Sequence, residues 1–430
     1  MKNSKILKWF IFTEPELMEC KQKSVAIIGA GPAGCACAYF SDKDYKITLF
    51  DFARPLHTLL YTGGGRCNLA YAEYDFKELA KFYPRGEKFL YSVFSRFATA
   101  DTIDFFEKIG VETYPQDDLR IFPTSNSAQD VREKILNNLQ SCTFKNEKVL
   151  KIIKEEDDFS ITTDYNSYHF DTVVIAVGGH AGFSLAKKLG HTIIDPKPSL
   201  VALVTQKSFK ALQGVCVKGV SAEVYFENSK VAQITDDILF THNGISGPLT
   251  YKISSVCARL GYNIQNPLKI KLNFSRHCET MDSAFAKGLS PKQSPSNFDS
   301  QTFQELLNSN PKKDIKNLIS DYVPKSLAEF ILQQNGIGLD EKCCNINGQK
   351  RDLIIKALTE FEIVVISPTK EGEVVTSGGV CLDEINPKTM ESKLVKGLYF
   401  CGEVVDVDGF CGGFNLQNCW STGFLAGSSL

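Results

Sequence analysis

Apolar and polar positions in the first 200 residues follow two periods, one typical of buried strands and one typical of helices. Residues 25–28 form a short apolar run, followed by a tight glycine turn and by small residues with helical spacing from Pro32 onward. A second apolar run lies in DYKITLFD and ends at Asp51. A strand, a turn, a helix and a strand in this order predict a Rossmann-like unit of an α/β fold.

Two later strand patterns end in polar or glycine residues. The segment FDTVVIAVGG ends at Gly178 and Gly179, and the strand pattern 398–401 ends at Gly402 and Glu403. Before the first of these, residues 144–170 alternate and turn like a small β-meander. After the second, a glycine-rich loop leads to a predicted helix over about residues 415–427.

The pattern changes in the middle of the chain. Residues 196–275 contain short alternating strands with turns, such as VCVKGVSAEVYF and NPLKIKLNF, which predicts a barrel or a sandwich. Residues 290–300 are typical of a linker, and helical spacing dominates residues 301–334, with two prolines as breaks. We expect this insertion to supply a second wall of the ligand site and to select the substrate.

Composition narrows the class of protein. A chain of 430 residues favours two or three structural units, and 43% hydrophobic with 23% charged residues is ordinary for a soluble globular protein. The net charge of -2 disfavours a general nucleic-acid coat but leaves a local basic face open. The 14 cysteines show no CxxC pair, which favours a reducing cytoplasm.

The apolar patch 9–12 is too short for a signal peptide, and no apolar stretch reaches the length of a membrane span. We therefore expect a cytoplasmic protein with no membrane partner; the sequence carries no signal for an oligomeric state. Residues 1–17, which precede Met18, are interpreted as an upstream extension or a misassigned start and are left out of the fold argument.

The first glycine turn has the spacing of a dinucleotide site. Gly29 permits the sharp turn, Gly31 lets the backbone approach a pyrophosphate, and Gly34 permits close packing of helix on strand. Asp51, twenty residues after Gly31, would accept hydrogen bonds from the adenosine ribose. The alternative is a Rossmann-like turn without a nucleotide and with Asp51 as a solvated strand end.

The later segments favour FAD over a diffusible nicotinamide. Gly178 and Gly179 bring bare backbone close to a ligand, and the strand around Val149 could offer its backbone to adenine. The C-terminal helix, beginning near Asn415, would aim its positive end at the flavin C2 carbonyl. The alternative is a strand, turn and helix whose glycines serve packing alone.

Several segments of the chain, in their order and spacing, resemble those of a known family. They are TGGGRCN, RIFPTSNSAQDV, LFTHNGISGP and the long C-terminal block from VTSGGVCLDEINP to FLAG. From about residue 24 to 427 the chain resembles the HI0933-like flavoproteins, also called the aminoacetone-oxidase family of NAD(P)/FAD-dependent oxidoreductases. The resemblance implies an FAD-binding Rossmann-like domain of the two-dinucleotide-binding type, interrupted by a β-barrel and a small helical subdomain.

The resemblance also implies domain limits and cofactor residues. Residues 18–194 and 366–430 would form the FAD-binding domain, 195–300 and 345–365 the β-barrel substrate domain, and 301–344 the helical subdomain. The second glycine loop would return toward the pyrophosphate, ribityl and flavin, with Arg66 as a bidentate cation and Cys67 as a packed side chain. The predicted cofactor-binding residues of the later segments are Gly64, Gly65, Arg66, Cys67, Asn68, Val149, Gly178, Gly179, Gly402, Glu403, Gly412, Gly413, Asn415 and Leu416.

Catalytic candidates lie in LFTHNGISGP. Pro248 suits the first turn of a helix, and His242 and Ser246 lie in the loop before it. His242 could protonate a substrate atom opposite the hydride, although a histidine in a turn is more often a structural hydrogen-bonder. The six histidines are scattered and indicate no metal site.

The sequence departs from the family pattern at two places. After Gly179 only HAGFSL remains where most relatives carry a longer segment near the cofactor, which puts flavin contacts and competence in doubt. Cys411 replaces a residue that is usually polar in the DG-x-GG loop, and a chance substitution is the simpler interpretation.

Two motifs that the sequence lacks narrow the class of reaction. No second complete GxGxxG is present, and Cys35 and Cys37 cannot share a helix face, so a dithiol relay is disfavoured. The resemblance implies an FAD-dependent oxidoreductase that passes a hydride through flavin N5, with NAD(P)H as a transient donor. The substrate would be an activated C=C bond, in ribosomal RNA uridine or in a small conjugated enone.

Two alternatives remain open: an amine oxidase that uses oxygen, and a non-catalytic protein with structural FAD. An RNA substrate would demand basic residues at the mouth of the site. The candidates are Lys187, Lys188, Lys312, Lys313 and Lys316, each of which can equally belong to a solvated helix face.

Overall fold

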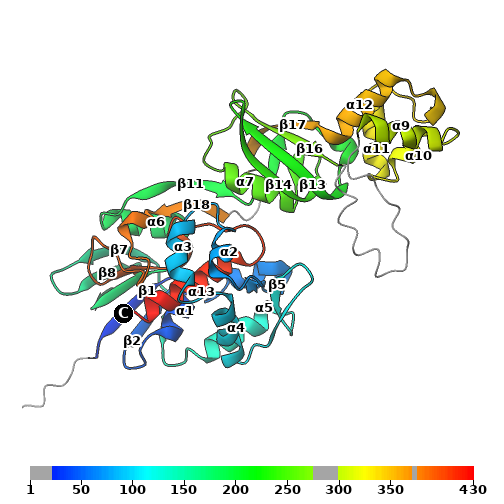
Figure 1. Cartoon of the computed structure of the whole chain (residues 1–430). Coiled ribbons are helices and arrows are strands. Elements are labelled where there is room, and N and C mark those ends of the chain that lie inside the picture. The colour runs from blue at the N-terminus through cyan, green and yellow to red at the C-terminus, as the bar shows by residue number, and fades with distance from the viewer. Residues whose placement is uncertain (1–21, 275–298, 370–374) are drawn as a thin grey trace, which may run out of the picture.

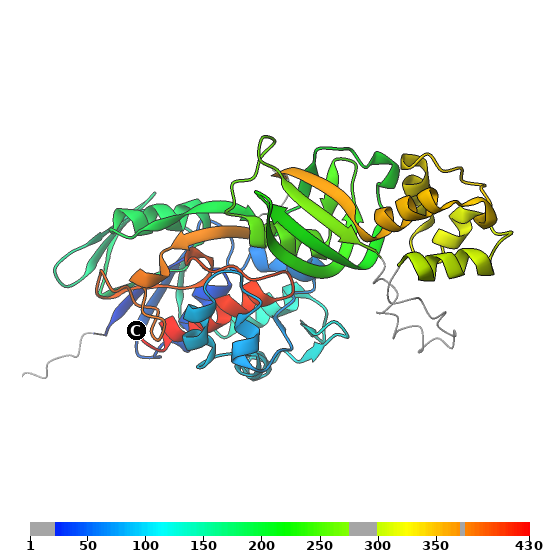
Figure 2. The ribbon, with the colours of Figure 1, turned by 45° about the horizontal axis from the view of Figure 1, so that its top comes forward.

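A computed structural model describes residues 22–274, 299–369 and 375–430. The predicted upstream extension 1–17 and nearly all of the predicted linker 290–300 lie outside these residues. Three parts follow one another in space, as Figure 1 shows: a Rossmann-like unit, a β-barrel beside it, and a helical unit at the far end of the barrel. The turned view in Figure 2 shows the same order.

A five-stranded parallel sheet forms the centre of the Rossmann-like unit. Its order is β19-β10-β1-β2-β6, so the first strand pairs on one side with the next strand along the chain and on the other side with a strand from a distant part of it. The strands are β1 (Ser24–Ile28), β2 (Lys46–Phe50), β6 (Thr143–Lys145), β10 (Thr172–Ile175) and β19 (Leu398–Phe400). Their apolar side chains are buried, as expected for a parallel sheet covered on both faces, except for Phe144 of the edge strand β6, which is 37% exposed.

A helix made largely of small residues and the C-terminal helix pack against each other beside this sheet. They are α1 (Pro32–Phe40) and α13 (Phe414–Gly427), and they join the start of the chain to its end. The approach is close because a Cβ added at Gly423 would lie 2.6 Å from the Ala33 carbonyl oxygen, and one at Gly427 would lie 2.4 Å from that of Cys37. The C-terminal helix therefore completes the core of the N-terminal unit.

Smaller elements surround the central sheet. One three-stranded sheet has the order β3-β5-β4, and the predicted meander has the order β7-β8-β9. The strands are β3 (Ala70–Tyr71), β4 (Thr113–Pro115), β5 (Arg120–Pro123), β7 (Val149–Lys154), β8 (Phe159–Thr163) and β9 (Ser167–Phe170). The helices are η1 (Thr58–Gly65), α2 (Phe76–Ala80), α3 (Glu87–Phe94), α4 (Thr99–Lys108), α5 (Ala128–Asn137) and α6 (Gly179–Lys188).

Two antiparallel strands, β11 (Ile193–Ser199) and β18 (Val375–Val380), lead from the Rossmann-like unit to the barrel. The barrel is closed, with the order β12-β15-β14-β13-β16-β17. Its elements are β12 (Leu203–Thr205), η2 (Lys210–Leu212), β13 (Cys216–Phe226), β14 (Ser229–Phe240), β15 (Gly244–Ser246), α7 (Pro248–Cys257), β16 (Leu268–Asn273) and β17 (Phe361–Pro368). Closure pairs every barrel strand with two neighbours, which removes free edges.

The helical unit contains α9 (Ser300–Ser309), α10 (Ile315–Ile319), α11 (Lys325–Gln334), η4 (Cys343–Asn345) and α12 (Gly348–Thr359). Residues 345–365, which the sequence analysis gives to the barrel, contain α12 and only the first part of β17. The side chain of Asn347 caps α12 by accepting a hydrogen bond from the Lys350 N–H at 2.9 Å. The predicted domain limits otherwise stay a prediction.

Buried apolar residues form two clusters, one in the Rossmann-like unit and one shared by the barrel and the helical unit. The predicted α/β fold, with a barrel and helices inserted between two parts of a Rossmann-like unit, is confirmed. In the described part of the chain, each helix is too short or too polar to cross a membrane.

Candidate functional site

The glycines of the first turn differ in their surroundings, since two are closely packed and one faces open space. Gly29 has a φ of +108°, and an added Cβ would lie 2.7 Å from the Val177 nitrogen. At Gly34 an added Cβ would lie 1.9 Å from the Gly29 carbonyl oxygen, so α1 can approach β1 only with glycine there. At Gly31 it would meet no atom within 4 Å. A glycine with free space in front of it is what a pyrophosphate needs.

Asp51 lies against this turn, as its spacing predicts. One carboxylate oxygen accepts a hydrogen bond from the Ala30 N–H at 2.8 Å, and the other accepts one from the Ala53 N–H at 2.9 Å. The carboxylate is thereby oriented at the carboxyl end of β2, where dinucleotides bind in such folds. Its oxygens keep lone pairs for a ribose, so the predicted role remains a prediction that the geometry permits.

The second glycine loop is a run of left-handed residues. Gly63, Gly64 and Gly65 have φ values of +58°, +67° and +82°. At Gly63 an added Cβ would lie 2.7 Å from the Asn68 nitrogen, whereas at Gly64 it would meet no atom within 4 Å. One side of this loop is thus packed and the other is open, the same division as in the first turn.

Cys67 is a packed residue at the end of this loop. Its φ is +64° and its side chain is fully buried. Burial raises the pKa of the Cys67 thiol to about 12, which keeps it protonated at neutral pH. The thiol is therefore a poor nucleophile, in agreement with the structural interpretation of this cysteine.

Asn68 joins the second glycine loop to the C-terminal one. Its amide oxygen accepts a hydrogen bond from the Gly413 N–H at 3.0 Å, and its amide nitrogen donates to the Ala70 carbonyl at 3.0 Å. Asn415 ties the same C-terminal loop from the other side, accepting from the Gly409 N–H at 2.8 Å and donating to the Gly409 carbonyl at 3.2 Å. Both predicted asparagines hold loops in place with their side chains.

Arg66 lies over an aromatic ring. Its guanidinium carbon is 4.1 Å from the centroid of the Phe122 ring, and the guanidinium carbon of Arg120 is 5.8 Å from the same centroid. Stacking of this kind fixes the plane of a guanidinium while its N–H groups stay available for an anion. Sequence reasoning quoted RIFPTSNSAQDV for the resemblance but assigned no role to Arg120 or Phe122.

Gly178 and Glu403 adjoin each other at the carboxyl ends of β10 and β19. A Cβ added at Gly178 would lie 3.3 Å from the Cβ of Glu403, and one at Gly179 would meet no atom within 4 Å. Glu403 is exposed, yet desolvation raises the pKa of its carboxyl, and the charge of Asp408 raises it further.

The segment after Gly179, which the sequence analysis describes as shortened, is the first part of α6. Three other predicted cofactor residues make contacts that belong to strand pairing, to a loop hydrogen bond and to core packing. Val149 begins β7 and pairs with Thr163, Gly402 donates its N–H to the Thr422 hydroxyl at 2.9 Å, and Leu416 packs against the core. Their predicted roles stay predictions, as does that of Gly412, whose φ is +139°.

One buried amide has no partner among the described atoms. Asn418 in α13 is 1% exposed, and neither its Oδ1 nor its Nδ2 makes a hydrogen bond there. An unpaired buried amide costs free energy that a bound polar group would recover. The open faces of Gly31, Gly64 and Gly179 fit a site that takes a polar ligand such as FAD.

The two catalytic candidates belong to the barrel. His242 is exposed in the turn between β14 and β15, and its carbonyl accepts a hydrogen bond from the Ser208 hydroxyl at 2.8 Å. The Ser246 hydroxyl donates to the Tyr251 hydroxyl at 3.1 Å, and Pro248 begins α7 as predicted. The hydrogen bonds that the described residues give to His242 and Ser246 all lie within the barrel.

Cys411 lies in the C-terminal glycine loop and is exposed. Desolvation raises the pKa of its thiol, the charge of Arg120 opposes this, and the charge of Asp236 on β14 adds to it. The loop therefore faces charged residues of both the β3-β5-β4 sheet and the barrel. Asp236 itself is paired with Lys252 of α7 at 2.7 Å.

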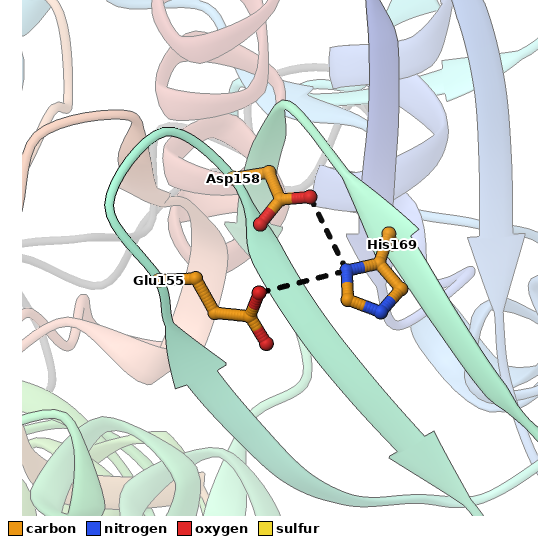
Figure 3. A group of neighbouring side chains, drawn as sticks. All are labelled: Glu155, Asp158 and His169. Atoms are coloured by element: carbon orange, nitrogen blue, oxygen red, sulfur yellow. Dashed lines mark hydrogen bonds and ion pairs between the residues drawn. The ribbon is translucent and has the colours of Figure 1, made fainter.

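Glu155, Asp158 and His169 are the group of possible metal ligands that the described residues bring together. They lie on the β-meander, as Figure 3 shows. His169 Nδ1 is 3.2 Å from Asp158 and 3.9 Å from Glu155. A hydrogen bond between the imidazole and Asp158 accounts for the closeness of these two residues, and we assign no metal to the group.

Sequence reasoning missed Arg85 and Asp408. Asp408 is 1% exposed and accepts hydrogen bonds from Arg85 and from two serine hydroxyls. The signal for Asp408 was its position directly before the glycine-rich loop. Arg85 had no such signal, because its partner lies 323 residues away in the sequence.

Comparison with known proteins finds relatives that span most of this chain. The ribosomal RNA dihydrouridine synthase of Escherichia coli (strain K12) is 29% identical over 427 residues, covering 94% of this chain and 97% of that protein. The 3-dehydro-bile acid delta(4,6)-reductase of Clostridium scindens is 27% identical over 422 residues, covering 94% and 98%. Among solved structures, the open conformation of a flavocytochrome c3 fumarate reductase is 16% identical, with a TM-score of 0.46 over 95% of this chain and 78% of that one.

The family model described as HI0933-like protein Rossmann domain matches residues 23–429, nearly the whole chain. The resemblance drawn from the sequence motifs is thereby confirmed. The protein belongs to the HI0933-like family, a family of FAD-dependent oxidoreductases.

Proposed function

We propose that this protein binds FAD and reduces an activated C=C bond with electrons from NAD(P)H. The observation that carries the proposal is that two relatives, each covering 94% of this chain, are both named for reactions that saturate a C=C bond. Dihydrouridine is uridine with its ring C=C bond reduced, and a delta(4,6)-reductase acts on C=C bonds of a steroid. In uridine that bond is conjugated with a carbonyl group.

The residues of this chain support the cofactor half of the proposal. Gly31, Gly64 and Gly179 each leave free space in front of the backbone, and Asp51 presents a carboxylate at the end of β2. Arg66, held over Phe122, offers a cation to a phosphate or to the flavin edge. Bound FAD supplies hydride transfer, which no side chain in the protein can supply.

The barrel supports the substrate half. We propose that His242 protonates the substrate atom opposite the hydride and that Ser246, in the same barrel, contacts the substrate. The exposure of His242 leaves its imidazole in contact with water, from which it regains a proton after each turnover. The N-terminus of α7, which starts at Pro248, places the partial positive charge of a helix in the same barrel.

The charges on the helical unit bear on the choice of substrate. Lys313 pairs with Asp321 at 2.5 Å, and Lys316 lies 3.9 Å from Asp340. Such pairing reduces the positive potential that an RNA backbone would meet, although exposed pairs are weak and rearrange easily. We therefore propose the shared chemistry, a C=C bond conjugated with a carbonyl, and leave RNA and small enones to be separated by experiment.

The test begins with the absorbance spectrum of the purified protein, followed by anaerobic addition of NADH and of NADPH in separate cuvettes. We expect a flavin spectrum that bleaches with at least one donor. Reoxidation should then follow addition of ribosomal RNA that lacks dihydrouridine, or of a small conjugated enone, with one reduced product per flavin. The Gly31→Ala variant serves as the control in which cofactor binding is weakened.

Other results would contradict the proposal in different ways. A bound flavin that NAD(P)H reduces only slowly, and that reoxidises without a reduced product, would favour a structural cofactor. Reduction of the flavin by an amine, with reoxidation by oxygen, would favour an amine oxidase. A wild-type protein that cannot be loaded with FAD would contradict the cofactor assignment itself.

A further inference from the structure

A buried carboxylate lies where four separate parts of the chain meet. Asp408 directly precedes the C-terminal glycine loop, and its exposed fraction is 1%. Arg85, between α2 and α3, donates to both carboxylate oxygens from Nε and Nη2. The Ser199 hydroxyl, at the end of β11, donates to one of these oxygens at 2.8 Å. The bidentate pair is thus completed by a donor from the strand that leads to the barrel.

The fourth part is α7 of the barrel. The Ser255 hydroxyl lies 3.3 Å from the same Asp408 oxygen and accepts a hydrogen bond from Arg85 Nη2 at 3.1 Å. Arg85 Nη1 also donates to the Ser255 carbonyl at 2.9 Å. The guanidinium therefore spans the boundary between the Rossmann-like unit and the barrel, with one edge on Asp408 and another on α7.

A second pair ties the same helix region to the Rossmann-like unit. Arg259, just after α7, forms an ion pair with Asp406 and donates to the Ser377 hydroxyl at 3.0 Å. Asp406 and Asp408 are two residues apart, so both arginines hold the start of the loop 408–413. The loop itself ends at Gly413, where Asn68 of the second glycine loop binds its N–H.

We infer that Arg85 and Asp408 form a positioning link through which α7 of the barrel holds the loop 408–413 in the conformation that the cofactor requires. A buried charge pair with all its donors in place resists displacement more than a surface pair does, because either partner alone would be left buried and unpaired. Movement of the barrel thereby changes the loop, and ordering of the loop favours one barrel position. The claim that the loop conformation serves the cofactor rests on the proposed function. The claim that α7 holds the loop does not.

The test uses two variants on α7 that each remove one buried hydroxyl. Ser255→Ala removes the group that contacts Arg85 and Asp408, whereas Thr250→Val removes a hydroxyl that donates to the Ser246 carbonyl inside the barrel. Hydrogen exchange is measured by mass spectrometry in the protein without FAD. We expect the peptide covering 406–413 to exchange about tenfold faster in Ser255→Ala and at the wild-type rate in Thr250→Val. Wild-type exchange of this peptide in Ser255→Ala would overturn the link.

FAD affinity tests the second half. Ser255→Ala should bind FAD at least about fivefold more weakly, within the usual range of coupling between sites, and Thr250→Val should match the wild type. Faster loop exchange in Ser255→Ala with unchanged FAD affinity would overturn the claim that the link serves the cofactor. Failure of the wild type to bind FAD would contradict the proposed function, while the exchange measurement would still decide whether the link exists.

A paired variant separates positioning from stability. Replacing both members, as Arg85→Met with Asp408→Leu, removes the charges without leaving either buried alone, and such replacements often keep stability. We expect a melting temperature near that of the wild type together with faster exchange of 406–413 and weaker FAD binding. If the double variant matched the wild type in melting temperature, in exchange of 406–413 and in FAD affinity, the charge pair would be only a stabilising contact and the inference would be overturned.

Discussion

Two glycines of the first turn are expected to respond in opposite ways to the same added methyl group. In Gly34→Ala the new Cβ would lie 1.9 Å from the Gly29 carbonyl oxygen and 3.1 Å from its carbon. Since Cβ atoms essentially never come within 3.0 Å of a backbone atom, α1 must move away from β1 by about 1 Å. Overpacking of this kind costs about 1–3 kcal/mol, with a melting temperature lower by about 2–4 °C for each kcal/mol.

In Gly31→Ala the methyl group would meet no atom within 4 Å, and the φ of -80° suits any residue. We therefore expect the stability without FAD to stay within about 0.5 kcal/mol of the wild type. The methyl group would occupy the space that the pyrophosphate needs, so FAD should bind about tenfold more weakly or worse, equivalent to about 1.4 kcal/mol.

The assay measures both quantities on the same preparations. FAD is removed, thermal unfolding is followed by calorimetry, and FAD is then titrated back while its fluorescence is recorded. Normal FAD affinity in Gly31→Ala would refute the assignment of the pyrophosphate to this turn. Normal melting of Gly34→Ala would refute the argument from close packing, and a loss of stability in Gly31→Ala would show that the open face is needed by the fold itself.

Three further predictions concern charged residues. Arg66→Ala should lower the FAD content of the purified protein, and a fully loaded variant with a normal flavin spectrum would remove Arg66 from the site. If RNA is the substrate, changing Lys312, Lys313 and Lys316 to Glu should weaken RNA binding and flatten its salt dependence; unchanged RNA reduction would contradict this role. Because desolvation raises the pKa of Glu403, the folded protein holds this proton more tightly than the unfolded chain, and stability falls as pH rises through the carboxyl range. Glu403→Gln should therefore raise the melting temperature at pH 7 and leave it nearly unchanged at pH 4, so an equal shift at both pH values would contradict the argument.

Much of the Rossmann-like unit could be predicted because its signals are local. The strand 25–28, the helix from Pro32 and the helix near 415–427 correspond to β1, α1 and α13 within a residue or so at the ends that were predicted. Each combines an apolar run with a glycine turn, and these are read from a few neighbouring residues. The barrel was predicted only as a class, since short alternating strands do not specify which strand pairs with which.

The helix α12 was assigned to the barrel although its signals are present. Asn347 is a good cap, and Leu353, Ile354 and Leu358 follow helical spacing. Among them only Ile354 and Leu358 are buried, and β17 follows almost at once. A helix that directly precedes a strand of a different unit gives the sequence no break at the boundary, which explains the assignment.

The candidate site divides in the same way between local and distant contacts. The open and packed faces of the glycine loops follow from the spacing of the glycines, because a turn and a helix start fix them within six residues. The contact of Asp408 with Arg85 and Ser255 forms only when three distant segments fold together. Each of these residue types is common on a protein surface, so none of them alone indicates a buried contact. An exposed carboxylate can lose such hydrogen bonds at little cost because water replaces them. A carboxylate that is 1% exposed depends on its hydrogen-bond donors in the protein. A buried charge with donors from both units is therefore one of the contacts that hold the barrel beside the Rossmann-like unit, together with the ion pair of Arg259 and Asp406.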